Sequence, residues 1–172
     1  VHERVRGVTS DGVLYSANDP HLLRWVHVAE IDSFLAAHQR FGLDPLDQHD
    51  RDAYVADTAK IARALGVPRV HVMAGLQPPG VPLADCLDTY VSNICWAADQ
   101  FGEAGIDVML EPINTKVDVP GYVMHSTADA VDCMRRASRP NIRLQYDVYH
   151  MQRMEGNLIH TMRRLQDRIG HV

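Results

Sequence analysis

The chain has 172 residues, which is the length of one ordinary domain and is enough to bury a hydrophobic core. With 46% hydrophobic and 23% charged residues and a mean hydropathy of −0.20, it has the composition of a soluble folded protein and not of a disordered one. Its net charge of −5 argues against a nucleic-acid or anionic-membrane partner, and no apolar run approaches the length of a membrane span.

The sequence contains three cysteines, Cys86, Cys95 and Cys133, which is an odd number and includes no CxxC spacing. A disulfide framework and a zinc knuckle are therefore unsupported. All three cysteines lie in helix-like patterns, so we expect buried free thiols in a reducing compartment. The cytoplasm is the expected location.

The first part of the chain, residues 1–50, is predicted to be a helical segment. Its opening is polar and carries turn signals at 10–12 and 18–20. Apolar residues then recur at helical spacing, which predicts a well-buried helix over about 20–40. The sequence pattern changes near residues 45–58, which indicates a boundary between this segment and the rest of the chain.

A second helix is predicted over about 50–65, and from residue 69 onward strands and helices alternate. Strands are expected over about 69–74, 106–110 and 142–146, and helices over about 82–103, 127–137 and 156–167. Strand–loop–helix repeated in this way predicts an α/β fold with a parallel sheet and helical crossovers.

The period of the repeat fits either a (β/α)₈ barrel or an open doubly wound sheet. No GxGxxG or GxxxxGK[ST] motif follows any predicted strand, so the sequence does not favour the phosphate-binding versions of these folds. A complete barrel needs about 250 residues. The prediction is therefore a partial TIM barrel of about three to four βα units over residues 56–172, preceded by the helical segment.

Polar side chains stand where the predicted strands end. His71 lies in the first strand, Glu111 directly follows the second, and Asp147 follows the third. The carboxyl ends of the strands form the active face of a parallel α/β protein, so Glu111 and Asp147 are expected to project into one crevice. Two neighbouring carboxylates repel unless a cation lies between them or one stays protonated, and oxygen ligands favour Mg²⁺ or Mn²⁺.

Each of these residues also has a purely structural interpretation. Asp147 is equally well placed to cap the following helix, whereas Glu111 is not, because Pro112 and a long loop follow it. The sequence leaves open whether His71 reaches the site or is a core histidine bonded to a neighbour. His150 is either a substrate contact or a histidine at the start of a helix.

The second half of the chain carries several short motifs over roughly residues 56–172. In chain order they are RVHVMAG (69–75), LEPIN (110–114), VPGY (119–122), LQYDVYHMQ (144–152), EGN (155–157) and IGHV (169–172). This combination resembles the hydroxypyruvate isomerase family, which belongs to the xylose isomerase-like TIM barrels. The resemblance implies reversible conversion of hydroxypyruvate to tartronate semialdehyde through an enediolate, assisted by a divalent metal (Mg²⁺ or Mn²⁺), with hydroxypyruvate or a similar small hydroxy-carbonyl acid or sugar as substrate.

Carried over residue by residue, the resemblance implies that Glu111 binds metal and acts as an acid/base, that Asp147 binds metal, and that His150 lies beside the substrate. His71, where it faces the site, is expected to contact the substrate too. The family's remaining ligands are a glutamine on the next strand and a glutamate on the last strand, and neither is found here. With Val1 as its first residue and a strand-like final stretch, the chain is expected to be a fragment with impaired turnover.

Residues 1–50 show a different resemblance. The stretches VHERVRG (1–7), DGVLYSANDP (11–20), LLRWVH (22–27) and DSFL (32–35) are similar to part of the all-helical oxygenase family related to latex-clearing proteins. Members of that family bind haem b, and the resemblance implies His2 as the axial ligand. A haem-dependent oxygenase fragment is therefore the alternative function. A third interpretation is a non-catalytic chimera whose open sheet edge pairs with another chain, a second copy included.

Overall fold

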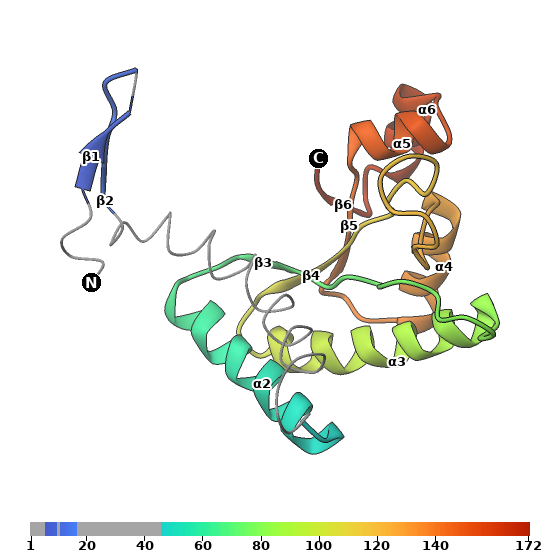
Figure 1. The fold of residues 1–172 in the computed structure, drawn as a ribbon, viewed down its shortest axis with the longest axis horizontal. Coiled ribbons are helices and arrows are strands. Elements are labelled where there is room, and N and C mark those ends of the chain that lie inside the picture. Colours follow the sequence, from blue (N-terminus) through green and yellow to red (C-terminus); the bar gives the residue numbers. More distant parts are fainter. Residues whose placement is uncertain (1–5, 10, 17–45) are drawn as a thin grey trace. The chain divides into compact units, whose positions relative to one another are not determined.

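The computed structural model describes residues 6–9, 11–16 and 46–172 (Figure 1). The chain divides into two compact units, Val1–Val67 and Pro68–Val172. The helix predicted over about 20–40 lies outside the described residues. Among the helices that are described, none is long and apolar enough to cross a lipid bilayer.

The described part of the first unit begins with an antiparallel hairpin. Strand β1 (Arg6–Val8) pairs with strand β2 (Leu14–Ser16). In the turn, the Gly12 N–H donates to the Thr9 carbonyl at 2.9 Å, and Gly12 has φ +86°, which glycine adopts without strain. The segment predicted as helical over 1–50 therefore contains a hairpin, because short apolar stretches flank its turn signal.

Helix α2 (Gln48–Ala64) completes the first unit and starts two residues before the predicted bound. Asp47 is its N-cap, and the Asp47 carboxylate accepts a hydrogen bond from the Asp50 N–H at 2.9 Å. Such a cap satisfies a backbone donor that has no partner within the helix. Gly66, with φ +63°, follows the last turn and ends the helix close to the predicted bound at about 65.

The second unit is built on a four-stranded parallel sheet, and its strands lie side by side in chain order. The strands are β3 (Arg69–His71), β4 (Asp107–Leu110), β5 (Ile142–Gln145) and β6 (Ile169–His171). The connections contain helices α3 (Leu83–Gly102), α4 (Thr127–Ala137), α5 (Val148–Met154) and α6 (Leu158–Leu165). This order confirms the predicted α/β fold and is that of consecutive βα units of a partial (β/α)₈ barrel.

The core of this unit lies between the sheet and the helices α3 and α4. Figure 1 shows α3 and α4 side by side, and α3 also packs against β4. The fully buried side chains include Ile94 of α3, Val108 and Leu110 of β4, and Leu144 of β5. Each of these contributes roughly 1.5–3 kcal/mol through burial of its apolar surface. Together they fix the relative positions of β4 and β5, whose ends carry the polar side chains.

The three cysteines are free, as predicted, but only one of them is buried. Cys133 lies in the core, whereas Cys86 and Cys95 are half-buried on α3. Helical periodicity explains the difference, because the buried face of α3 contains Tyr90, Ile94, Ala97, Ala98 and Phe101. The prediction of three buried thiols is therefore wrong for Cys86 and Cys95.

Candidate active site

The carboxyl ends of β4 and β5 bring three polar side chains together. Glu111 directly follows β4, Asp147 lies just after β5, and His150 lies in the first turn of α5. Each of the three offers one potential ligand atom, and these atoms all lie within 4.8 Å of one another. The parallel register therefore places at one edge the two carboxylates that the sequence analysis expected to share a crevice.

Asp147 caps a helix and belongs to this cluster at the same time. Its Oδ1 accepts a hydrogen bond from the His150 N–H at 2.9 Å, which makes Asp147 the N-cap of α5. The two interpretations that the sequence left open are thus not exclusive. Helix α5 lies outside the predicted helix bounds, which began at about residue 156, and its first turn fixes His150 beside the carboxylates.

Glu111 is held in an environment that favours its protonated form. Its side chain is only 14% exposed. Burial raises the pKa of the Glu111 carboxyl to about 7, and the negative charge of Asp147 adds to the increase. Without a cation, a proton is therefore what relieves the repulsion between the two carboxyl groups near neutral pH.

His71 faces Glu111 from the neighbouring strand β3. Its Nε2 lies 3.4 Å from Glu111 Oε2, which is long for a hydrogen bond, and in the described part of the chain this buried nitrogen has no hydrogen-bond partner. Burial lowers the pKa of the His71 imidazole to about 4, so the ring is neutral at pH 7. Of the two interpretations left open for His71, the geometry matches the one in which it reaches the site.

The donor set fits a divalent cation. Two carboxylates from neighbouring strand ends supply hard oxygen ligands, and Mg²⁺ and Mn²⁺ prefer such ligands. Burial and, to a smaller extent, the charge of Asp147 raise the pKa of Glu111, and a cation would replace the proton that otherwise neutralises this carboxyl. Glu111 and Asp147 are thus the residues that would hold the ion.

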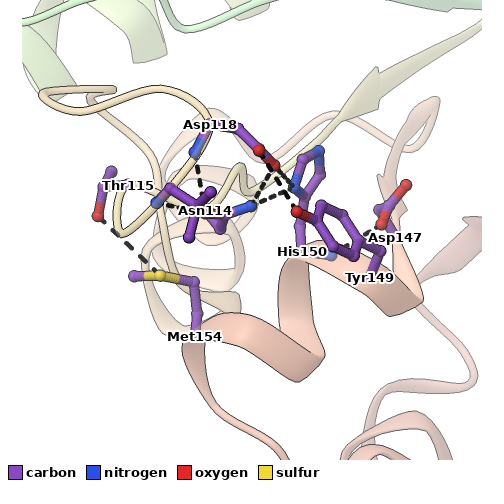
Figure 2. A network of polar contacts seen from close by, with 8 residues as sticks. Asn114, Thr115, Asp118, Asp147, Tyr149, His150 and Met154 are labelled. Atoms are coloured by element: carbon purple, nitrogen blue, oxygen red, sulfur yellow. Dashed lines mark hydrogen bonds and ion pairs between the residues drawn. The ribbon is translucent and has the colours of Figure 1, made fainter.

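A network of polar contacts beside the cluster was missed by sequence reasoning. Asn114 is fully buried and contacts both Asp118 and His150, and the Tyr149 hydroxyl donates to Asp118 Oδ1 at 3.3 Å. Figure 2 shows these side chains grouped at the start of α5. The available signal was Asn114 inside LEPIN, a polar residue close behind a buried strand.

The loop that carries Asn114 is held in place by hydrogen bonds. The Ile113 N–H donates to the Met124 carbonyl at 3.1 Å, so the two ends of the loop lie together. From the loop, Lys116 Nζ donates to the Arg153 carbonyl at 2.9 Å and to the Met154 carbonyl at 3.3 Å, which ties it to the last turn of α5. The residues around the cluster are therefore positioned by packing and hydrogen bonds.

The described residues thus form part of a parallel (β/α) barrel, with a carboxylate cluster at the carboxyl ends of its strands. A family model described as "Xylose isomerase-like TIM barrel" matches residues 18–172. The chain belongs to this family.

Several relatives carry isomerase names. The chain is 37% identical over 118 residues to hydroxypyruvate isomerase of Escherichia coli, covering 69% of this chain and 45% of that protein. It is 39% identical over 117 residues to a putative hydroxypyruvate isomerase of Caenorhabditis elegans, covering 67% and 44%. It is 34% identical over 139 residues to 2-oxo-tetronate isomerase of Cupriavidus necator, covering 80% and 53%. The chain thus spans about half the length of these curated relatives.

Solved structures agree on the fold. The crystal structure of an AP endonuclease, family 2, from Brucella melitensis matches with a TM-score of 0.64 and 28% identity, covering 83% of this chain and 62% of that one. D-psicose 3-epimerase from Clostridium cellulolyticum matches with a TM-score of 0.64 at 17% identity, covering 88% and 59%. At that identity the epimerase supports the barrel fold alone.

The family match begins at residue 18, whereas the sequence resemblance to an isomerase began at about residue 56. The family therefore reaches well into the segment compared with the haem oxygenases. That second resemblance stays a prediction, and its proposed axial ligand, His2, lies outside the described residues. Association between copies of the chain also stays a prediction.

Proposed function

We propose that this chain carries part of the active site of an isomerase acting on a small hydroxy-carbonyl acid, with hydroxypyruvate as the first candidate substrate. The observation that carries the proposal is the convergence of Glu111, Asp147 and His150 at the carboxyl edge of the sheet. The names of the relatives, hydroxypyruvate isomerase and 2-oxo-tetronate isomerase, support the same class of reaction.

The reaction requires a proton to leave the hydroxymethyl carbon of hydroxypyruvate and a proton to be added at the neighbouring carbonyl carbon. Glu111 is the group in this chain that takes the proton. The pKa of about 7 is that of Glu111 without a metal ion; when one carboxylate oxygen holds the ion, the other oxygen is left to accept and return the proton. A Mg²⁺ or Mn²⁺ ion held by Glu111 and Asp147 would supply positive charge that stabilises the negative charge developing on the substrate oxygens.

The two histidines have different parts in this proposal. His71 is neutral at pH 7 and lies beside Glu111, so it adds no positive charge that would hold the carboxylate deprotonated. His150 lies next to both carboxylates and is placed to contact an oxygen of the substrate. The free cysteines fit a reducing compartment, and a cytoplasmic location is part of the proposal.

The proton transfer can be tested without a complete turnover. Hydroxypyruvate is incubated with the chain and Mn²⁺ in deuterium oxide, the metal is removed, and deuterium at the hydroxymethyl carbon is measured by mass spectrometry. We expect faster incorporation than with Glu111→Gln, which keeps the shape of the side chain but cannot take a proton. Glu103→Gln, the same change at an exposed glutamate, is the control and should exchange like the wild type. Equal rates for the wild type and Glu111→Gln would contradict the proposal.

A further inference from the structure

The orientation of the buried Asn114 amide is fixed by the backbone of its own loop. Asn114 Oδ1 accepts hydrogen bonds from the Val117 N–H at 3.0 Å and from the Asp118 N–H at 3.3 Å. A flipped amide would turn its NH₂ group toward these two donors and lose both bonds, in a side chain that is 0% exposed. The NH₂ group of Asn114 must therefore face the other way.

On that other side, the two hydrogens of Asn114 Nδ2 meet two acceptors. Asp118 Oδ2 lies 2.5 Å from Nδ2, and His150 Nδ1 lies 3.0 Å from it (Figure 2). Nδ2 can only donate, so His150 Nδ1 must accept with its lone pair. The alternative, a proton on Nδ1 donated to Asp118, has no support because Asp118 Oδ2 lies 3.6 Å from Nδ1, beyond a normal hydrogen bond.

A histidine that accepts at Nδ1 carries its hydrogen on Nε2 when the ring is neutral. The lone pair of Nδ1 is then used by Asn114, and Nε2 is an N–H donor. Neither nitrogen offers a free lone pair to a cation. The proximity of His150 to Glu111 and Asp147 thus does not make it a third metal ligand, even though its position within 4.8 Å of them would allow one.

We propose that Asn114 is a positioning residue that fixes His150 as the Nε2–H tautomer, so that His150 donates a hydrogen bond to a substrate oxygen and does not bind the metal ion. This inference deepens the proposed function and rests on it for the substrate contact. The assignment of the tautomer rests on the hydrogen bonds alone.

The backbone and the ring of His150 are held independently, which makes the role of Asn114 separable. Asp147 accepts from the His150 backbone N–H, and Asn114 donates to the ring. Asp118 in turn is held from its second oxygen by the Tyr149 hydroxyl. A change at Asn114 therefore acts on the ring of His150 without removing the cap of α5.

Nuclear magnetic resonance of the chain labelled with ¹⁵N tests the tautomer directly. Long-range ¹H–¹⁵N correlations distinguish a protonated ring nitrogen from an unprotonated one, and His150→Gln identifies the His150 signals by their loss. For the neutral ring, we expect a protonated Nε2 and an unprotonated Nδ1. A protonated Nδ1 in the wild type would overturn the proposal, whether or not the isomerase function holds.

A charge-conserving exchange tests whether Asn114 causes this state. In Asn114→Asp combined with Asp118→Asn, a carboxylate oxygen replaces the donor that faces Nδ1, so the hydrogen should move to Nδ1. Thr115→Val, in the same loop, should leave the tautomer unchanged. An unchanged tautomer in the folded double variant would overturn the role of Asn114. If the double variant does not fold, Asn114→Ala is measured, and full retention of a single Nε2–H tautomer there would have the same meaning.

Addition of Mg²⁺ to the wild type separates this inference from the proposed function. We expect the signals of Glu111 and Asp147 to shift while the unprotonated Nδ1 of His150 keeps its hydrogen-bonded position. A large shift of a His150 ring nitrogen on saturation would show that it binds the ion, which would overturn the inference but support a metal site. Absence of any shift would count against the proposed function, while the tautomer in the metal-free spectrum still decides the role of Asn114.

Discussion

Glu111 lies where two effects act on its charge in the same direction. Burial removes water from the carboxylate, and Asp147 places a second negative charge close to it, so its pKa rises to about 7. Beside it, burial acts on His71 in the opposite sense and lowers that pKa to about 4. In the metal-free chain, both side chains therefore favour their neutral forms over much of the range between pH 4 and pH 7.

The raised pKa of Glu111 predicts that the free energy of unfolding depends on pH, and that Glu111→Gln removes this dependence. In the unfolded chain the Glu111 carboxyl titrates near its ordinary value of 4.5, and in the folded chain near 7. The folded state therefore binds an extra proton between these values. The stabilisation of the wild type linked to this proton is fully present below pH 4.5 and is lost as pH rises through 7.

We expect the free energy of unfolding of the wild type, relative to that of Glu111→Gln, to decrease steadily from pH 4.5 to pH 7. Urea unfolding in the presence of a chelator measures it, and the comparison cancels contributions from His71 and other shared groups. Parallel pH profiles for the two proteins would show that the folded state does not hold this proton.

At the scale of single residues, the sequence predicted the carboxylates and missed the amide. Glu111 and Asp147 follow apolar strands directly, so the strand pattern alone located them. The contact of Asn114 with His150 joins residues from different βα units, and no local pattern encodes it. Its hydrogen bonds depend on how the loop after β4 folds back on α5.

At the scale of elements, the region after α5 is linked to α4 through one carboxylate. Glu155 directly follows α5, and its Oε1 accepts from the Thr127 N–H at 2.6 Å while its Oε2 accepts from the Thr127 hydroxyl at 2.9 Å. Thr127 is the first residue of α4, so a negative charge lies at the positive end of that helix. Ser126, the N-cap of α4, satisfies a different donor, the N–H of Asp129.

We therefore predict that Glu155→Gln lowers the free energy of unfolding by about 1 kcal/mol, because it removes the charge at the helix terminus and one of the two acceptors. Thermal and urea unfolding measure the loss. Glu103→Gln, the same substitution just after the last turn of α3, is the matched control and should change stability by less than about 0.5 kcal/mol. Equal stability of the two variants would show that the contact with α4 contributes nothing.

The bounds predicted from the sequence do not include α5, β1 and β2. Helix α5 is only seven residues long, so it lacks the repeated apolar face by which α3 and α4 were found. Its start depends on the Asp147 cap. Strands β1 and β2 have three residues each, like β3, but they lie in a polar stretch outside the repeated strand–helix pattern that located β3. Local patterns identify long amphipathic elements, whereas these short ones depend on a cap or on a partner strand.

At the scale of the whole molecule, the regular alternation of strands and helices determined most of what was predictable. Parallel strands joined by helical crossovers must present their carboxyl ends at one edge, so residues far apart in the chain meet there. This is how Glu111 and Asp147 come to lie together although they follow different strands. The extent of the family was underestimated, because the match reaches back to residue 18 in a region where the motifs are weak.

Calorimetric titration of Mn²⁺ tests whether Glu111 and Asp147 form one divalent-metal site. We predict a binding isotherm for the wild type and for Glu103→Gln, and a loss of affinity of more than about tenfold, or ~1.4 kcal/mol, in both Glu111→Gln and Asp147→Asn. Asn is also a good N-cap, so Asp147→Asn should keep α5 intact. Superimposable isotherms for the wild type and the two site variants would show that Glu111 and Asp147 do not bind the ion.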